Sequence, residues 1–210
     1  MNILTRYRQS KAYPFYFKKR KDIIHIHITK TAGTSLIHSS KFKKSNKSKG
    51  VKKHYFSKEI IDIINQENWD KAFKFTFVRN PWDRLYSLYR FKLRKNKILS
   101  EEQGNTFEIW LKKTIEMQQA HTYQKSKPQV DWLKDFNNTI DIDFIGRFEE
   151  LESDVNKLSK ILNMKIDLPH INQTLPIIHY SSAYDDELED LVRIHYKEDI
   201  DLFNYTFERK

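Results

Sequence analysis

The feature that most constrains the fold is a β-branched run that leads directly into a small, hydroxyl-rich loop. Residues 23 to 29 read Ile-Ile-His-Ile-His-Ile-Thr, and Lys-Thr-Ala-Gly-Thr-Ser follows at residues 30 to 35. A short run rich in β-branched residues is typical of a strand buried inside a parallel sheet. We therefore expect a strand over Ile23–Thr29 and a helix from Gly33 to about Ser40.

The loop between this strand and helix has the composition of a phosphate site. The first backbone N–H groups of a helix point at one spot, which favours an anion there. Gly33 lets the backbone come close to a ligand, Lys30 adds a positive charge, and hydroxyl donors come from Thr31, Thr34 and Ser35. The loop differs from a Walker A loop, in which the lysine follows the last glycine. Considered alone, it is also compatible with an ordinary strand–helix turn.

Strands and helices alternate along the rest of the chain. We expect strands over Phe73–Arg79 and Asp143–Phe148, and helices over Ser57–Ile64, Pro81 to about Arg94, Thr106–Gln119, Glu149–Leu162 and Asp185–Lys197. Ser57 and Asn80 are the expected caps of the first two of these helices. The alternation predicts an α/β fold, with a P-loop-like core and a mainly parallel sheet flanked by helices.

Length, charge and composition limit the class of protein. A chain of 210 residues with 39% hydrophobic residues suits a single domain over 1–210, in which residues 41–53, with seven lysines, form a flexible connection. The net charge of +10 indicates an anionic partner. Without cysteine, neither a disulfide framework nor a cysteine metal site is possible. No apolar stretch near the N-terminus suits a signal peptide or membrane span, so we expect a cytoplasmic protein.

A second stretch, RNPWDRLYS at residues 79–87, also suits an anion. Arg79 ends a predicted buried strand, where ligands of open α/β sheets gather. Ser87 follows about two turns into the next helix. The arginine fork and the serine hydroxyl could hold one phosphate between them. Taken singly, an ion pair explains Arg79 and a solvent-facing helix position explains Ser87.

Together the two stretches resemble the sulfotransferases that use 3′-phosphoadenosine-5′-phosphosulfate (PAPS), in particular the carbohydrate branch of heparan and chondroitin type. The resemblance runs from about residue 23 to 205 and includes DFIGRFEEL at 143–151 and the segment 196–205. The sequence departs from the family at Thr29, where proline is common. Golgi members carry a membrane anchor that this sequence lacks, so the resemblance favours a bacterial enzyme.

The resemblance implies a reaction and a set of donor-binding residues. A sulfuryl group would pass from PAPS to a carbohydrate hydroxyl by in-line attack, with no metal required. Lys30 would stabilise negative charge on the leaving oxygen. Its loop, comprising Lys30, Thr31, Ala32, Gly33, Thr34 and Ser35, would hold the 5′-phosphosulfate. Arg79 and Ser87 would hold the 3′-phosphate.

A base must take the proton of the acceptor hydroxyl, and histidine suits this role near neutral pH. The resemblance assigns the role to His54, with His170 and Glu149 as alternatives. His25 and His27, in the first strand, are expected to be packing residues.

The acceptor is expected to be a carbohydrate or glycolipid, acidic sugars included, and not a nucleic acid. Its expected binding residues are His170, Lys53 and Arg147. The lysines of residues 41–53 could attract an acidic sugar. Trp110, Tyr123 and Trp132 could stack on sugar rings, although core packing is the expected role for most of them. The oligomeric state is left open.

Two other functions are weighed against the sulfotransferase. A P-loop kinase or NTPase would need a lysine after the loop glycine and a strand that ends in a magnesium-binding aspartate. A non-enzymatic binder of an acidic polymer, built on residues 41–53, would show steep salt dependence and no nucleotide preference.

Overall fold

The structure, a computed structural model, describes residues 15–17, 20–33, 36, 54–95, 106–119, 124–166, 168 and 178–210. The chain divides into two compact units, each with its own hydrophobic core. The first unit consists of Met1–Val78 and Asp131–Gln173, and the second unit of Arg79–Val130 and Thr174–Lys210. The single domain expected over residues 1–210 stays a prediction.

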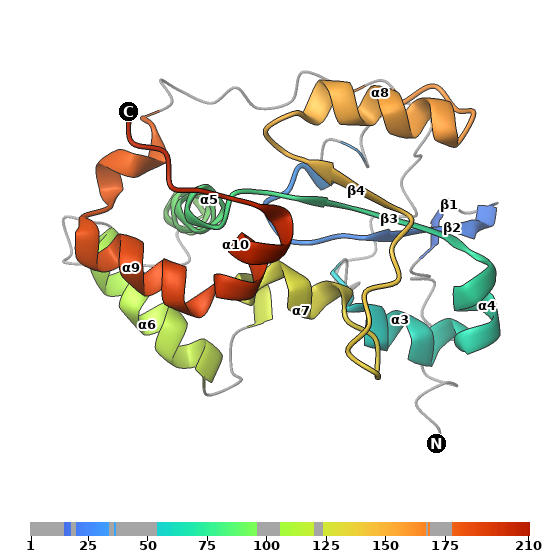
Figure 1. The fold of residues 1–210 in the computed structure, drawn as a ribbon, viewed down its shortest axis with the longest axis horizontal. Helices are drawn as coiled ribbons and strands as arrows, with labels where there is room; N and C mark the ends of the chain where they lie inside the picture. Colours follow the sequence, from blue (N-terminus) through green and yellow to red (C-terminus); the bar gives the residue numbers. More distant parts are fainter. Residues whose placement is uncertain are drawn as a thin grey trace. The chain divides into compact units, whose positions relative to one another are not determined.

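A four-stranded sheet forms the centre of the first unit (Figure 1). Its order is β1 (Phe15–Phe17), β2 (Arg20–Ile26), β3 (Phe73–Val78) and β4 (Phe144–Arg147). β2, β3 and β4 are parallel, and β1 pairs antiparallel with β2. The predicted α/β class with a mainly parallel sheet is confirmed, whereas the antiparallel β1 was not expected from the sequence.

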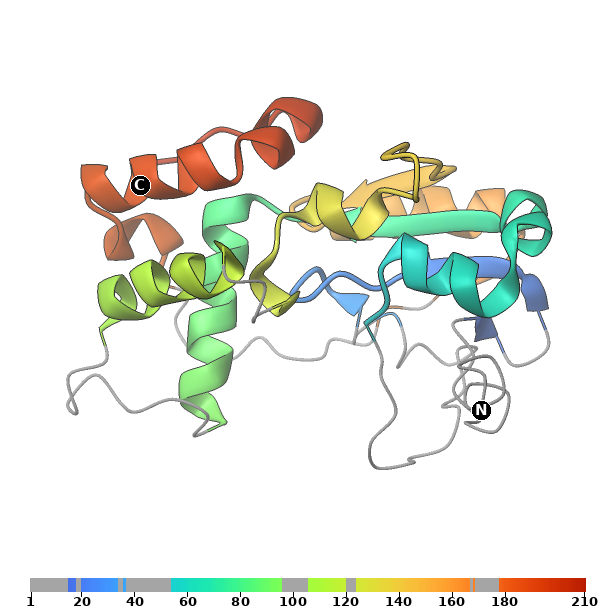
Figure 2. The ribbon, with the colours of Figure 1, turned by 90° about the horizontal axis from the view of Figure 1, so that it is seen from below.

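Helices cover both faces of this sheet. α3 (Ser57–Ile64) and α4 (Gln66–Lys71) lie on one face, and α8 (Leu151–Ile161) lies on the other (Figures 1 and 2). The phenylalanines of β3 pack under α8 in a cluster of buried residues that contains Ile23, Leu36, Phe75, Phe77, Val155, Leu158 and Ile166. These apolar side chains alternate with Lys74 and Thr76, which face the opposite side.

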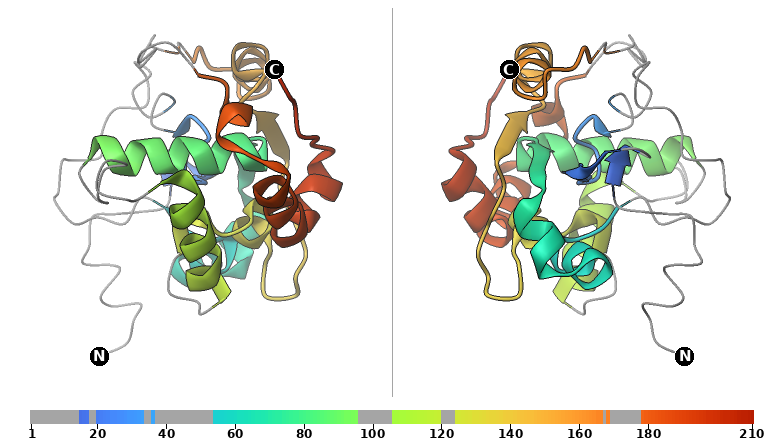
Figure 3. Two further views of the ribbon diagram at one scale, coloured as in Figure 1. Left: turned by 90° about the vertical axis from the view of Figure 1, so that its left-hand side faces the viewer. Right: turned by 90° about the vertical axis from the view of Figure 1, so that its right-hand side faces the viewer.

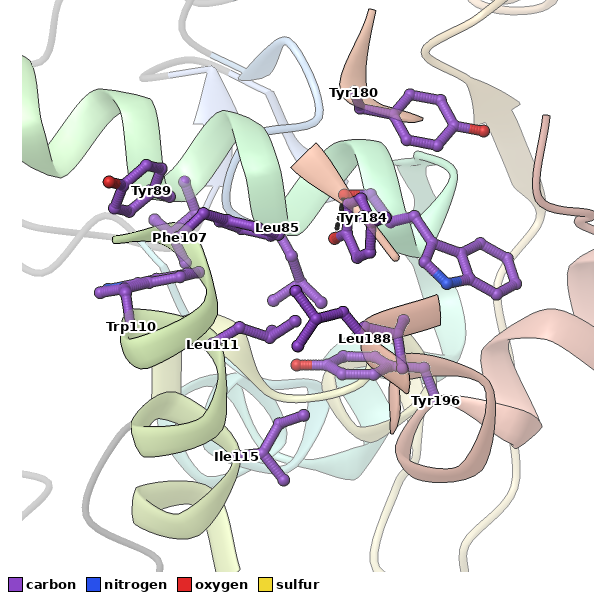
Figure 4. Packing of buried hydrophobic residues seen from close by; sticks show 13 residues of the cluster. Leu85, Tyr89, Phe107, Trp110, Leu111, Ile115, Tyr180, Tyr184, Leu188 and Tyr196 are labelled. Atoms are coloured by element: carbon purple, nitrogen blue, oxygen red, sulfur yellow. Dashed lines mark hydrogen bonds between the residues drawn. The ribbon is translucent and has the colours of Figure 1, made fainter. Parts of the chain in front are cut away.

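The second unit is helical. It contains α5 (Pro81–Arg94), α6 (Phe107–Gln119), α9 (Asp186–His195) and α10 (Lys197–Phe203), with short 3-10 turns η2 (Gln124–Ser126) and η3 (Tyr180–Ala183). Figure 3 shows α5 lying across α6. Figure 4 shows the aromatic core that these helices share, and its buried residues include Leu85, Tyr89, Phe107, Trp110, Tyr180, Tyr184, Leu188 and Tyr196. α7 (Gln129–Leu133) contains the boundary between the units.

Helix starts follow local hydrogen bonding. Asn80 caps α5 as predicted, because its side-chain oxygen accepts from the Trp82 N–H (3.1 Å). The predicted cap at Ser57 is wrong: Phe56 holds the cap position, and its N–H donates to the carboxylate of Glu59 (2.9 Å). Glu59 therefore supplies the carboxylate half of a capping box, and Ser57 becomes the first helical residue.

Other differences concern boundaries. The first predicted strand ends three residues early, at Ile26, and the chain turns at Thr29 and Lys30. The last predicted helix is interrupted at Tyr196 and continues as α10.

Trp110 and Trp132 are 4% and 1% exposed, so their expected core role is confirmed. Residues 34–35, 37–53 and Tyr123 lie outside the described residues. Within the described ranges, none of the helices combines the length and apolarity needed to cross a membrane.

Candidate functional site

The loop after β2 has a strained backbone. Of the non-glycine residues in the described part of the chain, six have a positive φ, and four of these are asparagine, which tolerates that region well. The other two are Lys30 (φ 68°) and Ala32 (φ 66°), separated by one residue. Left-handed residues alternating with others are typical of a nest, a concave row of backbone N–H groups that binds anions. Each such residue costs on the order of 1–3 kcal/mol, and strain of this kind concentrates at functional sites.

Gly33 is required for a reason that the sequence did not reveal. A Cβ at this position would lie 2.1 Å from the Cδ2 and Nε2 atoms of the His27 ring. His27 is itself buried, at 6% exposure, so the ring has little room to move aside. The loop therefore rests on His27, and only glycine fits there. The Leu36 N–H donates to the Ala32 carbonyl (3.2 Å), in agreement with a helix that opens at Gly33.

Thr31 has a structural bond within the loop. Its hydroxyl donates to the carbonyl of Ile28 (3.0 Å), and the residue is fully buried. The hydroxyl proton is thus used in a hydrogen bond within the turn. An anion in the loop would contact the backbone N–H of Thr31 instead of its hydroxyl. Thr34 and Ser35, the other two predicted hydroxyl donors, lie outside the described residues.

His54 lies directly beside the base of this loop. Its Nδ1 is 2.8 Å from the main-chain oxygen of His27, and the two rings are 4.2 Å apart. A carbonyl oxygen only accepts, so the neutral His54 ring carries its proton on Nδ1 and its lone pair on Nε2. The ring is half-buried, and the edge of Trp132 lies 6.3 Å away. This tautomer is the one that can accept a proton through Nε2.

His25 and His27 are packing residues, as expected. The His25 ring stacks on Phe75 (4.6 Å) and on His27 (5.3 Å), and it is 5% exposed. Burial, together with the smaller influence of the charge on a protonated His54, lowers the pKa of His25 from 6.5 to about 3. His25 is therefore neutral at physiological pH.

The carboxyl ends of the three parallel strands of the first unit share one edge of the sheet. The Lys30 loop follows β2, and Arg147 ends β4 beside Val78 of β3. Arg147 is half-buried, and its N–H donates to Asp154 (2.7 Å). Ligands of open parallel sheets bind at this edge. Lys53 and His170, the other two expected acceptor residues, lie outside the described residues.

Arg79 is the first residue of the second unit and immediately follows β3. Its Nε atom donates to the carboxylate of Asp83, one turn along, at 2.7 Å. The arginine side chain is 12% exposed. Ser87, also half-buried, lies a further four residues along α5. Residues four apart on a helix share a face, so Asp83 and Ser87 lie on the same face of α5. The Arg79 side chain contacts this face through Asp83.

Two important residues near Arg79 were missed by the sequence analysis. Gln129 and Asp199 are fully buried and hydrogen-bonded to each other. Gln129 also bonds the main chain of Arg79. Asp199 lies in a charged stretch between Glu198 and Asp201, so no local sequence signal distinguishes it from a surface acid. Among the residues that the structure describes, no group of three metal-ligating side chains is placed to hold a metal ion.

Comparisons with known proteins identify the family of the chain. The profile described as "Sulfotransferase family" matches residues 13–206. A sulfotransferase from Alicyclobacillus acidocaldarius, known from a crystal structure, is similar over 95% of this chain and 92% of its own, with 13% sequence identity and a TM-score of 0.41. No curated protein matches the chain. Because the family profile spans nearly all of the 210 residues, the chain belongs to the sulfotransferase family.

Proposed function

We propose that this enzyme transfers a sulfuryl group from PAPS to a hydroxyl group of a carbohydrate or glycolipid, with His54 as the base. The observation that carries the proposal is the strained loop at Lys30 and Ala32, which directly follows the strand β2 of a sulfotransferase-family chain. A preformed row of N–H groups stabilises charge without reorganising during the reaction. Family membership favours this reaction over the kinase and polymer-binding alternatives.

In the proposal, the loop binds the 5′-phosphosulfate of the donor. The backbone N–H groups of residues 31 to 35 hold the phosphate, and Lys30 balances the charge that develops on the bridging oxygen as the S–O bond breaks. The acceptor oxygen attacks sulfur in line with this leaving oxygen. Positioning and electrostatic stabilisation supply most of the rate in transfers of this kind.

Arg79 and Ser87 bind the 3′-phosphate of the donor. The contact between Arg79 Nε and Asp83 supports this assignment, because it fixes the edge of the guanidinium and so orients the N–H donors of its terminal nitrogens. Ser87 adds a hydroxyl donor from the same helix. A 3′-phosphate distinguishes PAPS from ATP and AMP, so these residues would set donor selectivity.

His54 accepts the proton of the attacking hydroxyl through Nε2. The bond from Nδ1 to the His27 carbonyl supports this role, since it selects the required tautomer and holds the ring. Arg147, Lys53 and His170 bind the acceptor in this proposal. The carbohydrate branch of the family and a bacterial origin are parts of the same proposal and rest on the sequence resemblance.

Calorimetry with 3′-phosphoadenosine 5′-phosphate (PAP) and 5′-AMP tests the proposal. The wild-type protein should bind PAP at least about tenfold more tightly, because a buried charge-assisted phosphate contact is worth more than about 1.4 kcal/mol. Arg79→Ala should remove the preference. Arg94→Ala is the matched control, because Arg94 is exposed at the far end of α5. Equal affinities of the wild-type protein for PAP and AMP would contradict the proposed donor.

A further inference from the structure

The main chain of Arg79 is held by one buried side chain. The Arg79 N–H donates to the side-chain oxygen of Gln129 (2.9 Å), and the Gln129 side-chain N–H donates to the Arg79 carbonyl (2.8 Å). Arg79 lies just beyond β3, so its peptide groups have left the sheet ladder. The two hydrogen bonds to the Gln129 side chain take the place of the bonds that a neighbouring strand would make. We call this pair of bonds the clamp, and it fixes the backbone from which the guanidinium extends.

Asp199, from α10, holds the clamp in turn. One carboxylate oxygen accepts from the Gln129 main-chain N–H (2.7 Å) and from its side-chain N–H (3.2 Å). The other accepts from the Val130 N–H (2.9 Å). Both Gln129 and Asp199 are fully buried. The carboxylate therefore determines which end of the Gln129 amide faces the Arg79 carbonyl.

A buried arginine compensates the charge of this carboxylate. Arg84, 1% exposed, donates to the carbonyls of Ser126 (3.2 Å) and Lys127 (2.6 Å). Burial raises the pKa of Asp199 to about 6, against the opposing effects of Arg84 and of the Gln129 and Val130 N–H groups. A charged carboxylate is kept in the core only where donors satisfy it, and here they belong to the segment that carries the clamp.

We propose that Gln129 and Asp199 are positioning residues that set the selectivity for the donor's 3′-phosphate by fixing Arg79 in its binding direction. The inference rests on the function proposed above. With the backbone held by Gln129 and the Nε edge held by Asp83, both ends of Arg79 are constrained before the ligand arrives. Preorganisation of this kind increases affinity because less freedom is lost on binding.

Calorimetry on the Gln129→Ala protein provides the first test. We expect the affinity for PAP to fall about tenfold and that for 5′-AMP to change less than about twofold, because only the contact to the 3′-phosphate loses its preorganisation. The KM for PAPS should rise while kcat at saturating donor is unchanged. Gln124→Ala, an exposed glutamine on the same segment, is the matched control and should behave like wild type.

A purely structural role for Gln129 would weaken both nucleotides equally or lower kcat, and either result overturns the inference. Gln129→Glu is the second variant, in case the alanine variant does not fold. It keeps the acceptor for the Arg79 N–H but places an oxygen against the Arg79 carbonyl and Asp199, so it should also lose the preference for PAP. If wild type prefers PAP and the folded variants keep the full preference, this inference fails while the proposed donor stands. If wild type shows no preference, the proposed donor fails first.

Discussion

His25, His27 and His54 form a row of three rings at the end of β2, yet their surroundings differ. His25 is enclosed by Phe75 and His27, and its pKa is lowered to about 3. His54 is half-buried and bonded through Nδ1 to a main-chain oxygen. The same residue type therefore serves as packing at one position and, in the proposed function, as the base at the other. Substitutions of His25 and of His54 test the two roles separately.

His25→Phe should make folding less sensitive to acid. The pKa of His25 is about 3 in the folded protein and 6.5 in the reference state, so between these pH values the unfolded chain binds more protons. Stability from this residue is therefore present above pH 6.5 and is lost as the pH falls. Between about pH 7 and pH 5 the wild type should lose about 2 kcal/mol of unfolding free energy that the phenylalanine variant keeps. Urea denaturation at both pH values measures the difference, and parallel losses in the two proteins would show that His25 does not titrate in this way.

His54→Ala should separate binding from chemistry. The proposed donor contacts do not include its ring, so the Kd for PAP should stay within about twofold, whereas kcat should fall about 10²–10⁴-fold with the loss of the proposed general base. Steady-state kinetics with PAPS and a carbohydrate acceptor give kcat. His195→Ala in α9 serves as the control. Retention of full turnover would point to another base, such as His170 or Glu149.

Several contacts within the first unit support the loop that contains Lys30. β2 lies between β1 and β3, so the strand that leads into Lys30 is paired on both sides. The hydroxyl of Thr76, in β3, donates to the Ile26 carbonyl at the very end of β2 (2.8 Å). The loop thus starts from a fixed strand end and rests on the His27 ring. Backbone strain persists where the surrounding structure holds it, and Thr76 and His27 supply such contacts here.

Gly33→Ala should therefore destabilise the protein by about 1–3 kcal/mol, the usual range for overpacking, and should weaken PAP binding. The added methyl overlaps the His27 ring, so the same change should be much less damaging in a His27→Ala background. Thermal melts and PAP calorimetry on the two single variants and the double variant measure this coupling. Strictly additive effects would mean that the contact between Gly33 and His27 does not matter.

Long, strongly patterned elements were predictable from the sequence. β3, α5 and α6 match their predicted ranges within one residue, because apolar periodicity and the Asn80–Pro81 start are local signals. β1, α4 and α10 were missed, since short elements depend on partners distant in sequence. The strained loop residues were identified as candidates, but the supports beneath them were not. Contacts such as those of Gln129 with Arg79 join residues 50 apart and leave no local pattern.

At the scale of the whole molecule, the net charge bears on which acceptors the enzyme would attract. The net charge is +10, and the family profile covers residues 13–206. A positive surface attracts anionic ligands over a range limited by the Debye length, about 10 Å at 0.1 M salt. An acidic acceptor would gain from this attraction, whereas a neutral acceptor would not.

Salt should affect acceptors unequally. With PAPS saturating, raising the salt from about 50 to about 300 mM should increase the KM for a carboxylated or sulfated sugar several-fold, because screening removes long-range attraction. The KM for a neutral sugar of similar size should change less than about twofold. Initial-rate measurements on such a pair decide the matter. Equal responses would indicate that the excess lysines have no part in acceptor binding.

The clamp on Arg79 also has a consequence for how the enzyme is made. Asp199, which orients Gln129, is translated long after Arg79. If the clamp acts as proposed, the arginine cannot take up its binding direction before residue 199 has been made. Nascent chains stalled before codon 199 should thus lack the preference for PAP over 5′-AMP, which should emerge only in chains that include Asp199.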